Sequence, residues 1–426
     1  MEDSMERVQL SNRFRRNAIQ PDAAQKMIQQ HIRPGDVERV PLEEAFGRRL
    51  AADVFASDPM PHFCRSGMDG FAIRWESTIG ASSDQPVVLE VIESIPCGST
   101  PTKTITGNMA SRIMTGAMVP EGANAVVMLE IAECFEQDGK TFISIKKEQK
   151  EGQNITLPGF ELAKGELVLE KGRKINAGEI ALLAAFGMET VNVFKRPKVA
   201  IFATGSELLS VHAPLEPGKI RNSNTHMLAA LVREAGGTPV LMETIPDDAE
   251  RAMERITDAF SIADCVITTG GVSVGDYDIM VDIFEAWEGT TLFNKVMMRP
   301  GSPTTVGVMK DKFLFALSGN PGACFVGFEL FVRPVLWGMQ GKKDVLPPEA
   351  TAFLGEDFTK VNAYPRFVRA KSYIEDGKVY VKMAGPDQSS VMLSIKDSDC
   401  FLVIPPGGRG VLAGEKVRMV QLGVTE

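Results

Sequence analysis

The middle of the chain alternates short continuous apolar runs with segments whose apolar residues recur at helical spacing. The runs 199–203, 265–267 and 313–317 are typical of strands buried on both faces of a parallel sheet. Strands that alternate with helices through short connections predict a doubly wound α/β domain. The expected helices of this domain are 225–236, 249–260, 279–287 and 323–332, the last ending near Pro334.

On either side of this domain the apolar positions recur with a period near two. Residues 86–147 predict a mostly β domain, and residues 347–426 predict a small β-barrel or sandwich. Nearer the N-terminus, helical spacing predicts a helix over 21–31 and a second, short helix over 42–50. The expected strands are 87–92, 110–114, 125–129 and 142–145, then 366–370, 379–383, 401–404 and 416–420.

Composition narrows the class of protein. The chain has 426 residues, enough for two to four domains, and a formal net charge of -9. That charge argues against general binding of nucleic acid or an anionic membrane, although it allows a local basic pocket. The six cysteines form no CxxC pair, which suits the reducing cytoplasm. No apolar run is long enough to span a bilayer, and residues 1–16 lack the apolar core of a signal peptide.

Three glycine-rich turns, 204–207, 268–275 and 318–322, follow the ends of predicted strands. In doubly wound folds ligands bind outside the carboxyl ends of the strands, where the strand order reverses. Glycine turns that lead toward helix N-termini offer free N–H groups and partial positive charge, so they favour phosphate. The chain has neither GxGxxG nor GxxxxGK[ST], which disfavours a nicotinamide dehydrogenase and a P-loop NTPase.

Carboxylates accompany these turns, and a carboxylate beside an anion-binding loop implies a cation between the two charges. Mg²⁺ bridging carboxylate and phosphate is the usual arrangement. The sequence therefore predicts an anion site that a divalent cation supports. The candidate acids are Glu207, Asp247, Asp276 and Asp278.

Five segments together resemble the molybdopterin molybdenumtransferase (MoeA) family, to which the C-terminal domain of gephyrin is related. They are Met68-Asp69-Gly70-Phe71-Ala72, 113–125, 203–208, 269–278 and 317–321, in the family's order. The resemblance covers the chain from about residue 20 to its end. It implies a homodimer whose cleft lies between the α/β domain of one subunit and the β domain and barrel of the other.

The resemblance also implies four domains per chain, with one domain inserted into another. A disordered extension precedes them, the α/β domain is similar to molybdopterin adenylyltransferase, and the chain ends in a β-barrel. The implied ranges are 1–19 for the extension, 20–58 with 165–195 for a discontinuous elongated domain, 59–164 for the inserted β domain, 196–345 for the α/β molybdopterin-binding domain and 346–426 for the barrel.

The reaction that the resemblance implies inserts molybdenum from molybdate into adenylylated molybdopterin and releases AMP, with Mg²⁺ as cofactor. It implies contact with molybdopterin adenylyltransferase and with cofactor-delivery proteins. Asp69, Glu207 and Asp278 match the catalytic acids, and Glu207, Asp247 and Asp278 match the metal ligands. Arg299 matches a basic residue and is the expected binder of molybdate or phosphate. The implied binding positions are Thr115, Gly116, Thr204, Gly205, Ser206, Gly270, Gly271, Ser273, Gly275, Arg299, Pro300, Gly301, Ser318, Gly319, Asn320 and Pro321.

The chain departs from the family pattern in three places. The loop 155–161 lacks the arginines that the family often carries, and Glu161 is the match to its last acid. Arg65 stands where asparagine is common and could compensate in part, and Ser302 replaces a frequent lysine. A lost cation would weaken oxyanion or phosphate contacts by about 1–3 kcal/mol if buried.

These departures leave alternatives to the insertion reaction. One is a divergent paralogue that carries or scaffolds the cofactor, and another inserts tungsten. Molybdopterin adenylylation needs only the α/β domain, so the added β domains argue against it. Retention of Asp69, Glu207 and Asp278 favours the enzyme over a scaffold, because unpaired acids clustered in a cleft are costly.

Overall fold

The computed structural model describes residues 17–245, 248–271, 279–286, 288–408 and 410–423. The chain divides into two compact units. The larger unit comprises Met1–Ala52, Lys171–Ile180 and Glu189–Glu426, and the smaller comprises Asp53–Glu170 and Ala181–Met188. The domain boundaries that the resemblance implies stay predictions.

The larger unit contains the predicted doubly wound sheet, with strand order β16-β13-β17-β20-β19-β18. The first four strands are parallel, and the last two run antiparallel to their neighbours. After β13 the chain adds β16 on one side and then β17 on the other, so the order reverses between β13 and β17. The strands are β13 Lys198–Ala203, β16 Thr238–Leu241, β17 Cys265–Thr269, β18 Thr290–Phe293, β19 Thr305–Met309 and β20 Lys312–Leu317.

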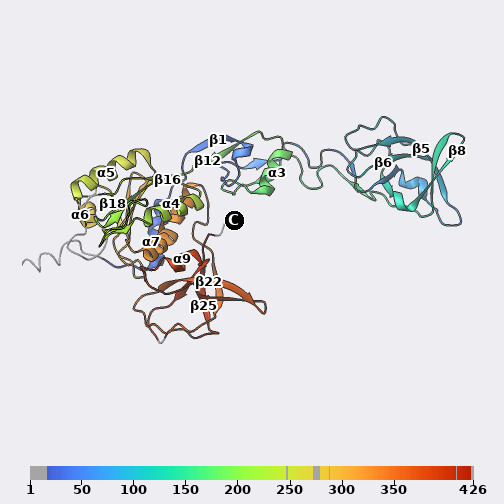
Figure 1. Ribbon diagram of the computed structural model, residues 1–426. Helices are drawn as coiled ribbons and strands as arrows, with labels where there is room; N and C mark the ends of the chain where they lie inside the picture. Colours follow the sequence, from blue (N-terminus) through green and yellow to red (C-terminus); the bar gives the residue numbers. More distant parts are fainter. Residues whose placement is uncertain (1–16, 246–247, 272–278, 287, 409, 424–426) are drawn as a thin grey trace, which may run out of the picture. The chain divides into compact units, whose positions relative to one another are not determined.

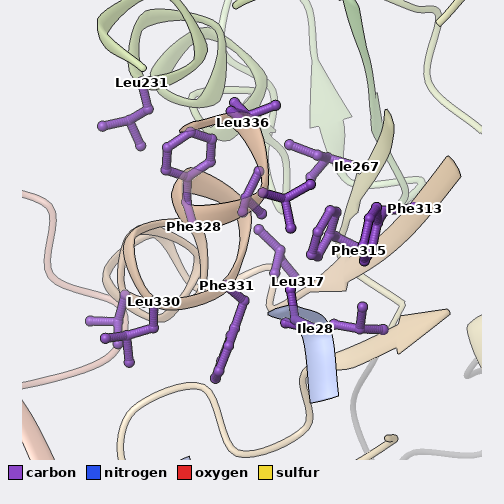
Figure 2. Packing of buried hydrophobic residues seen from close by; sticks show 14 of the residues in the cluster. Ile28, Leu231, Ile267, Phe313, Phe315, Leu317, Phe328, Leu330, Phe331 and Leu336 are labelled. Carbon is purple, nitrogen blue, oxygen red and sulfur yellow. The ribbon is translucent and has the colours of Figure 1, made fainter. Parts of the chain in front are cut away.

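Alternate residues of each central strand enter two different cores, because successive side chains in a strand point to opposite faces. Ala200 and Phe202 face α5 (Ala249–Ile262) and α6 (Ile279–Glu285), which lie together beside the sheet (Figure 1). The other face packs on α4 (Asn224–Glu234) and on a long helix over 321–339. Figure 2 shows this second core with Ile267, Phe315, Leu317, Phe328, Phe331 and Leu336.

The long helix differs from the sequence expectation that it ends near Pro334. It runs through α7 (Pro321–Gly327), a π-helical turn (Phe328–Val332) and α8 (Arg333–Met339). Proline removes one N–H and crowds the preceding turn, and the wider π turn before Pro334 lets the helix continue. The helix is long and apolar enough to cross a membrane by length and composition, but it is wholly buried inside the protein.

Residues 349–421 form a closed five-stranded barrel, so of the two predicted alternatives the structure has the barrel. Phe367 and Phe401 of the barrel belong to the same core as the long helix. The ring of Phe401 meets Phe325 edge-on, with centroids 5.8 Å apart. The strands are β21 Glu349–Leu354, β22 Arg366–Glu375, β23 Lys378–Met383, β24 Cys400–Ile404 and β25 Lys416–Gln421 (Figure 1).

Two helices were predicted in the N-terminal part of the larger unit, and one of them forms. The helix predicted over 21–31 is α2 (Pro21–His31). The helix predicted over 42–50 is wrong, because only a 3₁₀ turn, Leu42–Glu44, forms there. Gly47 has a φ of +74°, and Leu50 then forms a β-bridge with Val193 beside β1 (Val37–Pro41) and β12 (Thr190–Phe194).

The smaller unit is built on a six-stranded sheet with order β7-β4-β6-β5-β9-β8, which confirms the predicted β domain. Two short pairs accompany it, β2 (Val54–Phe55) with β11 (Leu167–Leu169) and β3 (Arg65–Ser66) with β10 (Ile155–Thr156). Helix α3 (Ala177–Ala185) contributes residues to both units. The sheet strands are β4 Gly70–Ile73, β5 Val87–Ile95, β6 Met109–Ile113, β7 Ala125–Met128, β8 Ala132–Gln137 and β9 Lys140–Ile145.

Candidate active site

A pocket of about 1920 Å³ lies in the larger unit, where β13, β17 and β20 end. This is the edge of the sheet at which the strand order reverses, so the pocket has the position expected of a ligand site in this fold. Barrel residues of the same chain line its other side. The expected cleft between the α/β domain of one subunit and the β domain and barrel of the other stays a prediction. Thirteen predicted site residues line the pocket: Thr204, Gly205, Ser206, Glu207, Gly270, Gly271, Arg299, Pro300, Gly301, Ser318, Gly319, Asn320 and Pro321.

The three glycine-rich turns touch one another at the floor of the pocket. A Cβ added to Gly270 would lie 2.5 Å from the carbonyl oxygen of Thr204, and the φ of Gly270 is +102°. A Cβ added to Gly319 would lie 3.4 Å from the Cα of Gly270. Glycine is therefore required at 270 both for the backbone conformation and for this close approach.

Asn224, the first residue of α4, ties the turns together and was not among the predicted site residues. Its Nδ2 donates to Thr269 Oγ1 (2.9 Å) and to the carbonyl of Gly319 (2.8 Å). Thr269 Oγ1 donates in turn to the carbonyl of Ser318 (3.1 Å). Asn224 Oδ1 and Thr204 Oγ1 are buried and have no hydrogen-bond partner among the described residues. The predicted helix 225–236 begins directly after Asn224, but nothing in the local sequence shows that this helix start lies beside the turns.

Glu207 is the one predicted acid that the described part of the pocket contains. Its carboxylate covers Gly205, where an added Cβ would lie 2.4 Å from a carboxylate oxygen. The side chain is exposed. No group of three or more histidine, cysteine or acidic side chains with metal-binding geometry occurs among the described residues. Mg²⁺ typically takes one or two carboxylates and completes its shell with water and substrate phosphate, so a lone Glu207 at an anion pocket fits it.

Among the described lining residues cations outnumber carboxylates, in a chain whose net charge is -9. Arg366 donates to Asp387 (2.6 Å), so this pair is neutral. Arg299 lies between two barrel contacts, because its N–H donates to Pro365 (2.9 Å) and its carbonyl accepts from Phe367 (2.8 Å). The lining charges are Lys219, Arg221, Lys295, Arg299 and Arg366 against Glu207 and Asp387.

Such a pocket attracts anions, because a surplus of cations inside a concave site focuses its field. The side chain of Arg299 has no ion pair with any residue that the structure describes, so its charge is open to a ligand. Sequence reasoning identified Arg299 but missed Arg366, which the barrel brings in from another domain. Nothing in the local sequence of Arg366 marks it as a site residue.

The remaining binding candidates lie in the smaller unit, where two predicted motifs meet. Asp69 Oδ1 accepts from the N–H of Thr115 (2.6 Å) and from its hydroxyl (3.0 Å). These two bonds hold the pKa of the exposed Asp69 carboxyl below its ordinary value. Gly116 follows with a φ of +82° and donates its N–H to the carbonyl of Ser66 (2.8 Å).

The divergent loop 155–161 packs beside this turn. Arg65 and Ser66 form a two-residue ladder with Thr156 and Ile155. Arg65 also pairs with Glu161 at 2.9 Å, and both side chains are more than a third exposed. An exposed pair of this kind contributes about 0–1 kcal/mol to stability. Arg65 therefore has a carboxylate partner in this chain.

Five predicted residues lie outside the described residues. They include two of the three predicted metal ligands, one predicted catalytic acid and one further candidate acid. Their roles stay predictions. The residues are Asp247, Ser273, Gly275, Asp276 and Asp278.

Comparison with known proteins gives matches along nearly the whole chain. Three family models match: MoeA N-terminal region (domain I and II) over 19–187, probable molybdopterin binding domain over 200–337, and MoeA C-terminal region (domain IV) over 351–422. The chain is 44% identical over 408 residues to a molybdopterin molybdenumtransferase of Bacillus subtilis, covering 95% of this chain and 94% of that protein. A molybdopterin molybdenumtransferase of Staphylococcus aureus is 44% identical over 381 residues, 89% of this chain and 90% of that one.

The fold matches solved structures as well. A crystal structure of a molybdopterin biosynthesis MoeA protein from Pyrococcus horikoshii superposes with a TM-score of 0.81 at 33% identity. The match covers 95% of this chain and 100% of that one. The predicted class, a multidomain α/β plus β fold with a doubly wound domain and a C-terminal barrel, is confirmed.

Proposed function

The chain belongs to the MoeA family of molybdopterin molybdenumtransferases, transferases of molybdenum cofactor biosynthesis, and we propose that it inserts molybdenum from molybdate into adenylylated molybdopterin. AMP is the second product. The observation that carries this proposal is the cationic pocket in which thirteen predicted residues converge. Its substrates are a diphosphate and an oxyanion, the classes of ligand that such a pocket attracts.

The proposed reaction places two demands on the pocket. Hydrolysis of the phosphoanhydride bond consumes one water and gives AMP and the molybdopterin phosphate. The two dithiolene thiols form two sulfur–molybdenum bonds, and their two protons leave with one oxygen of molybdate as water. The diphosphate needs N–H donors, and the N–H groups of Gly271 and Gly319 at the pocket donate to no residue that the structure describes. Molybdate needs a cation, and Arg299 supplies one that no described carboxylate neutralises.

A divalent cation such as Mg²⁺ would be held by Glu207, with Asp247 and Asp278 as the other proposed ligands. When bound, it neutralises charge on the diphosphate. Asp69 is the proposed acid of the smaller unit. Because the bonds from Thr115 lower its pKa, it is ionised at neutral pH and presents a hydrogen-bond acceptor to solvent.

Three further proposals rest on the resemblance. The chain is a homodimer, which sedimentation at micromolar concentration tests. It works in the cytoplasm, which its six free cysteines fit. It exchanges its substrate and product with molybdopterin adenylyltransferase and cofactor-delivery proteins, which pull-down with each purified protein tests.

The test of function is AMP release from adenylylated molybdopterin in the presence of molybdate and Mg²⁺. We expect release that requires molybdate and falls by at least tenfold in Asp69→Asn and in Glu207→Gln. Glu254→Gln, on the exposed face of α5, is the matched control and is expected to retain wild-type activity. Wild-type protein that binds the nucleotide but releases no AMP with molybdate or tungstate would refute the proposal and favour a carrier.

A further inference from the structure

The proposed substrate carries two flat ring systems, a pterin and an adenine, and one aromatic side chain is available to them among the described lining residues of the pocket. Tyr364 is the only aromatic residue among the described residues that line it. The other two described tyrosines, Tyr373 and Tyr380, stack on each other with centroids 5.5 Å apart. The ring of Tyr364 has no such aromatic partner in the described part of the chain.

The backbone on both sides of Tyr364 is fixed. On one side, Asn362 accepts from Arg366 Nε at its Oδ1 (2.5 Å) and from the N–H of Gly407 at its carbonyl (2.5 Å). On the other side, the carbonyl of Pro365 accepts from the N–H of Arg299 (2.9 Å). A ring on so constrained a loop costs little ordering when a ligand binds, which is the condition for an effective stacking platform.

The neighbours of Tyr364 suit a nucleoside monophosphate. The Arg366–Asp387 bond joins the Tyr364 loop to the segment 387–392, which brings the half-exposed thioether of Met392 to the same pocket. Methionine sulfur packs well against rings. The loop also contacts the backbone of Arg299, whose guanidinium has no ion pair with any described residue and suits a phosphate. A ring that can stack on a base and a cation that can bind a phosphate thus lie together on the barrel side of the pocket.

The strand-end side of the pocket has a different chemistry. Amide side chains line it, including Asn222, Asn224 and Asn320, and Asn224 Oδ1 has no hydrogen-bond partner among the described residues. These groups suit a pterin, whose amide and amine edge makes several hydrogen bonds. Tyr364 instead offers mainly a ring face, on which a base can stack without hydrogen bonds to its edge. From this division we infer that the adenine of the nucleotide stacks on Tyr364. The inference rests on the proposed function and adds a purine subsite to it.

The test is isothermal titration calorimetry of the full-length protein with AMP and with ribose 5-phosphate. Loss of one base–aromatic stack weakens binding by about tenfold, so Tyr364→Ala is expected to lose about tenfold in AMP affinity. Its affinity for ribose 5-phosphate is expected to match wild type. Tyr364→Phe should retain AMP affinity, whereas Tyr364→Leu, which keeps apolar bulk without the ring, should fall with Tyr364→Ala. Phe46→Ala, at an exposed ring outside the pocket lining, is the matched control.

Three results would overturn the inference: unchanged AMP affinity in Tyr364→Ala, an equal loss for ribose 5-phosphate, or no AMP binding by wild type. Thermal melting of each variant checks that the fold is intact. Molybdate-dependent AMP release by wild type, measured in parallel, separates this inference from the proposed function. If release is present and Tyr364→Ala binds AMP normally, only the purine subsite is refuted. If release is absent, the proposed function itself fails.

Discussion

Asn224 is the residue whose loss tests most sharply how the pocket is built. Its Nδ2 makes two buried hydrogen bonds, to Thr269 Oγ1 and to the carbonyl of Gly319, and they join α4 to the ends of β17 and β20. A hydrogen bond contributes about 0.5–1.5 kcal/mol net, so Asn224→Ala is expected to lower the free energy of unfolding by about 2 kcal/mol. Asn224→Asp replaces the donor with an acceptor that faces two acceptors, so its expected cost is higher, about 3 kcal/mol.

Differential scanning calorimetry and steady-state kinetics measure the two consequences. For the larger unit, about 300 residues, 2 kcal/mol corresponds to a fall in Tm of about 3 °C. The KM for adenylylated molybdopterin is expected to rise, because the three turns lose the side chain that joins them. Asn192→Ala, on an exposed position of β12, is the control and should change neither value. An Asn224→Ala protein that melts with wild type and keeps its KM would refute this account of the pocket.

Three further substitutions have definite expected outcomes. Gly270→Ala adds a Cβ that meets the neighbouring turn at 2.5 Å in a left-handed conformation, so denaturant titration should show a loss of about 2–4 kcal/mol. Thr115→Val removes the hydroxyl bond to Asp69 but keeps the N–H bond, so an NMR titration should show the Asp69 pKa rise part of the way to its ordinary value. Arg333→Met leaves Glu329 buried without its partner and should cost about 3–5 kcal/mol, most of it recovered when Glu329→Leu is added.

Each of these substitutions has its own control or contradiction. Gly139→Ala has a positive φ of +75° and open space around it, so it should cost less than Gly270→Ala, and equal costs would contradict the close-approach argument. An Asp69 pKa that does not move in Thr115→Val would show that the hydroxyl bond has no electrostatic role. If Arg333→Met alone is as stable as the variant that also carries Glu329→Leu, Arg333 does not offset the cost of burying the Glu329 charge.

The parts of the fold that the sequence predicted are those where one local pattern decides the structure. The continuous apolar runs form β13, β17 and β20, because a strand that is buried on both faces carries apolar residues at successive positions. Strand β8 was not predicted, because most of its residues are exposed and it has no buried face. The helix expected over 42–50 had the right spacing, but Gly47 and the pairing of Leu50 with Val193 outweighed it.

The site residues that the sequence predicted are likewise those that a local pattern marks. Glycine turns at strand ends were visible in sequence because the turn itself demands glycine, and they converge as predicted. Arg366, Tyr364 and Asn224 were missed, because their role comes from tertiary packing that places the barrel and α4 beside the turns. Asp69 and Thr115 were identified separately, and only the structure shows that one binds the other.

The most direct test of the central claim is the location of the ligands in a crystal of the protein soaked with AMP and tungstate. Tungstate stands in for molybdate and gives a strong anomalous signal. The account predicts the tungsten peak and the AMP phosphate within the one pocket, between Arg299 and the turns of Gly270 and Gly319, with the adenine on Tyr364. Ligands bound reproducibly outside that pocket, with the pocket empty, would contradict it.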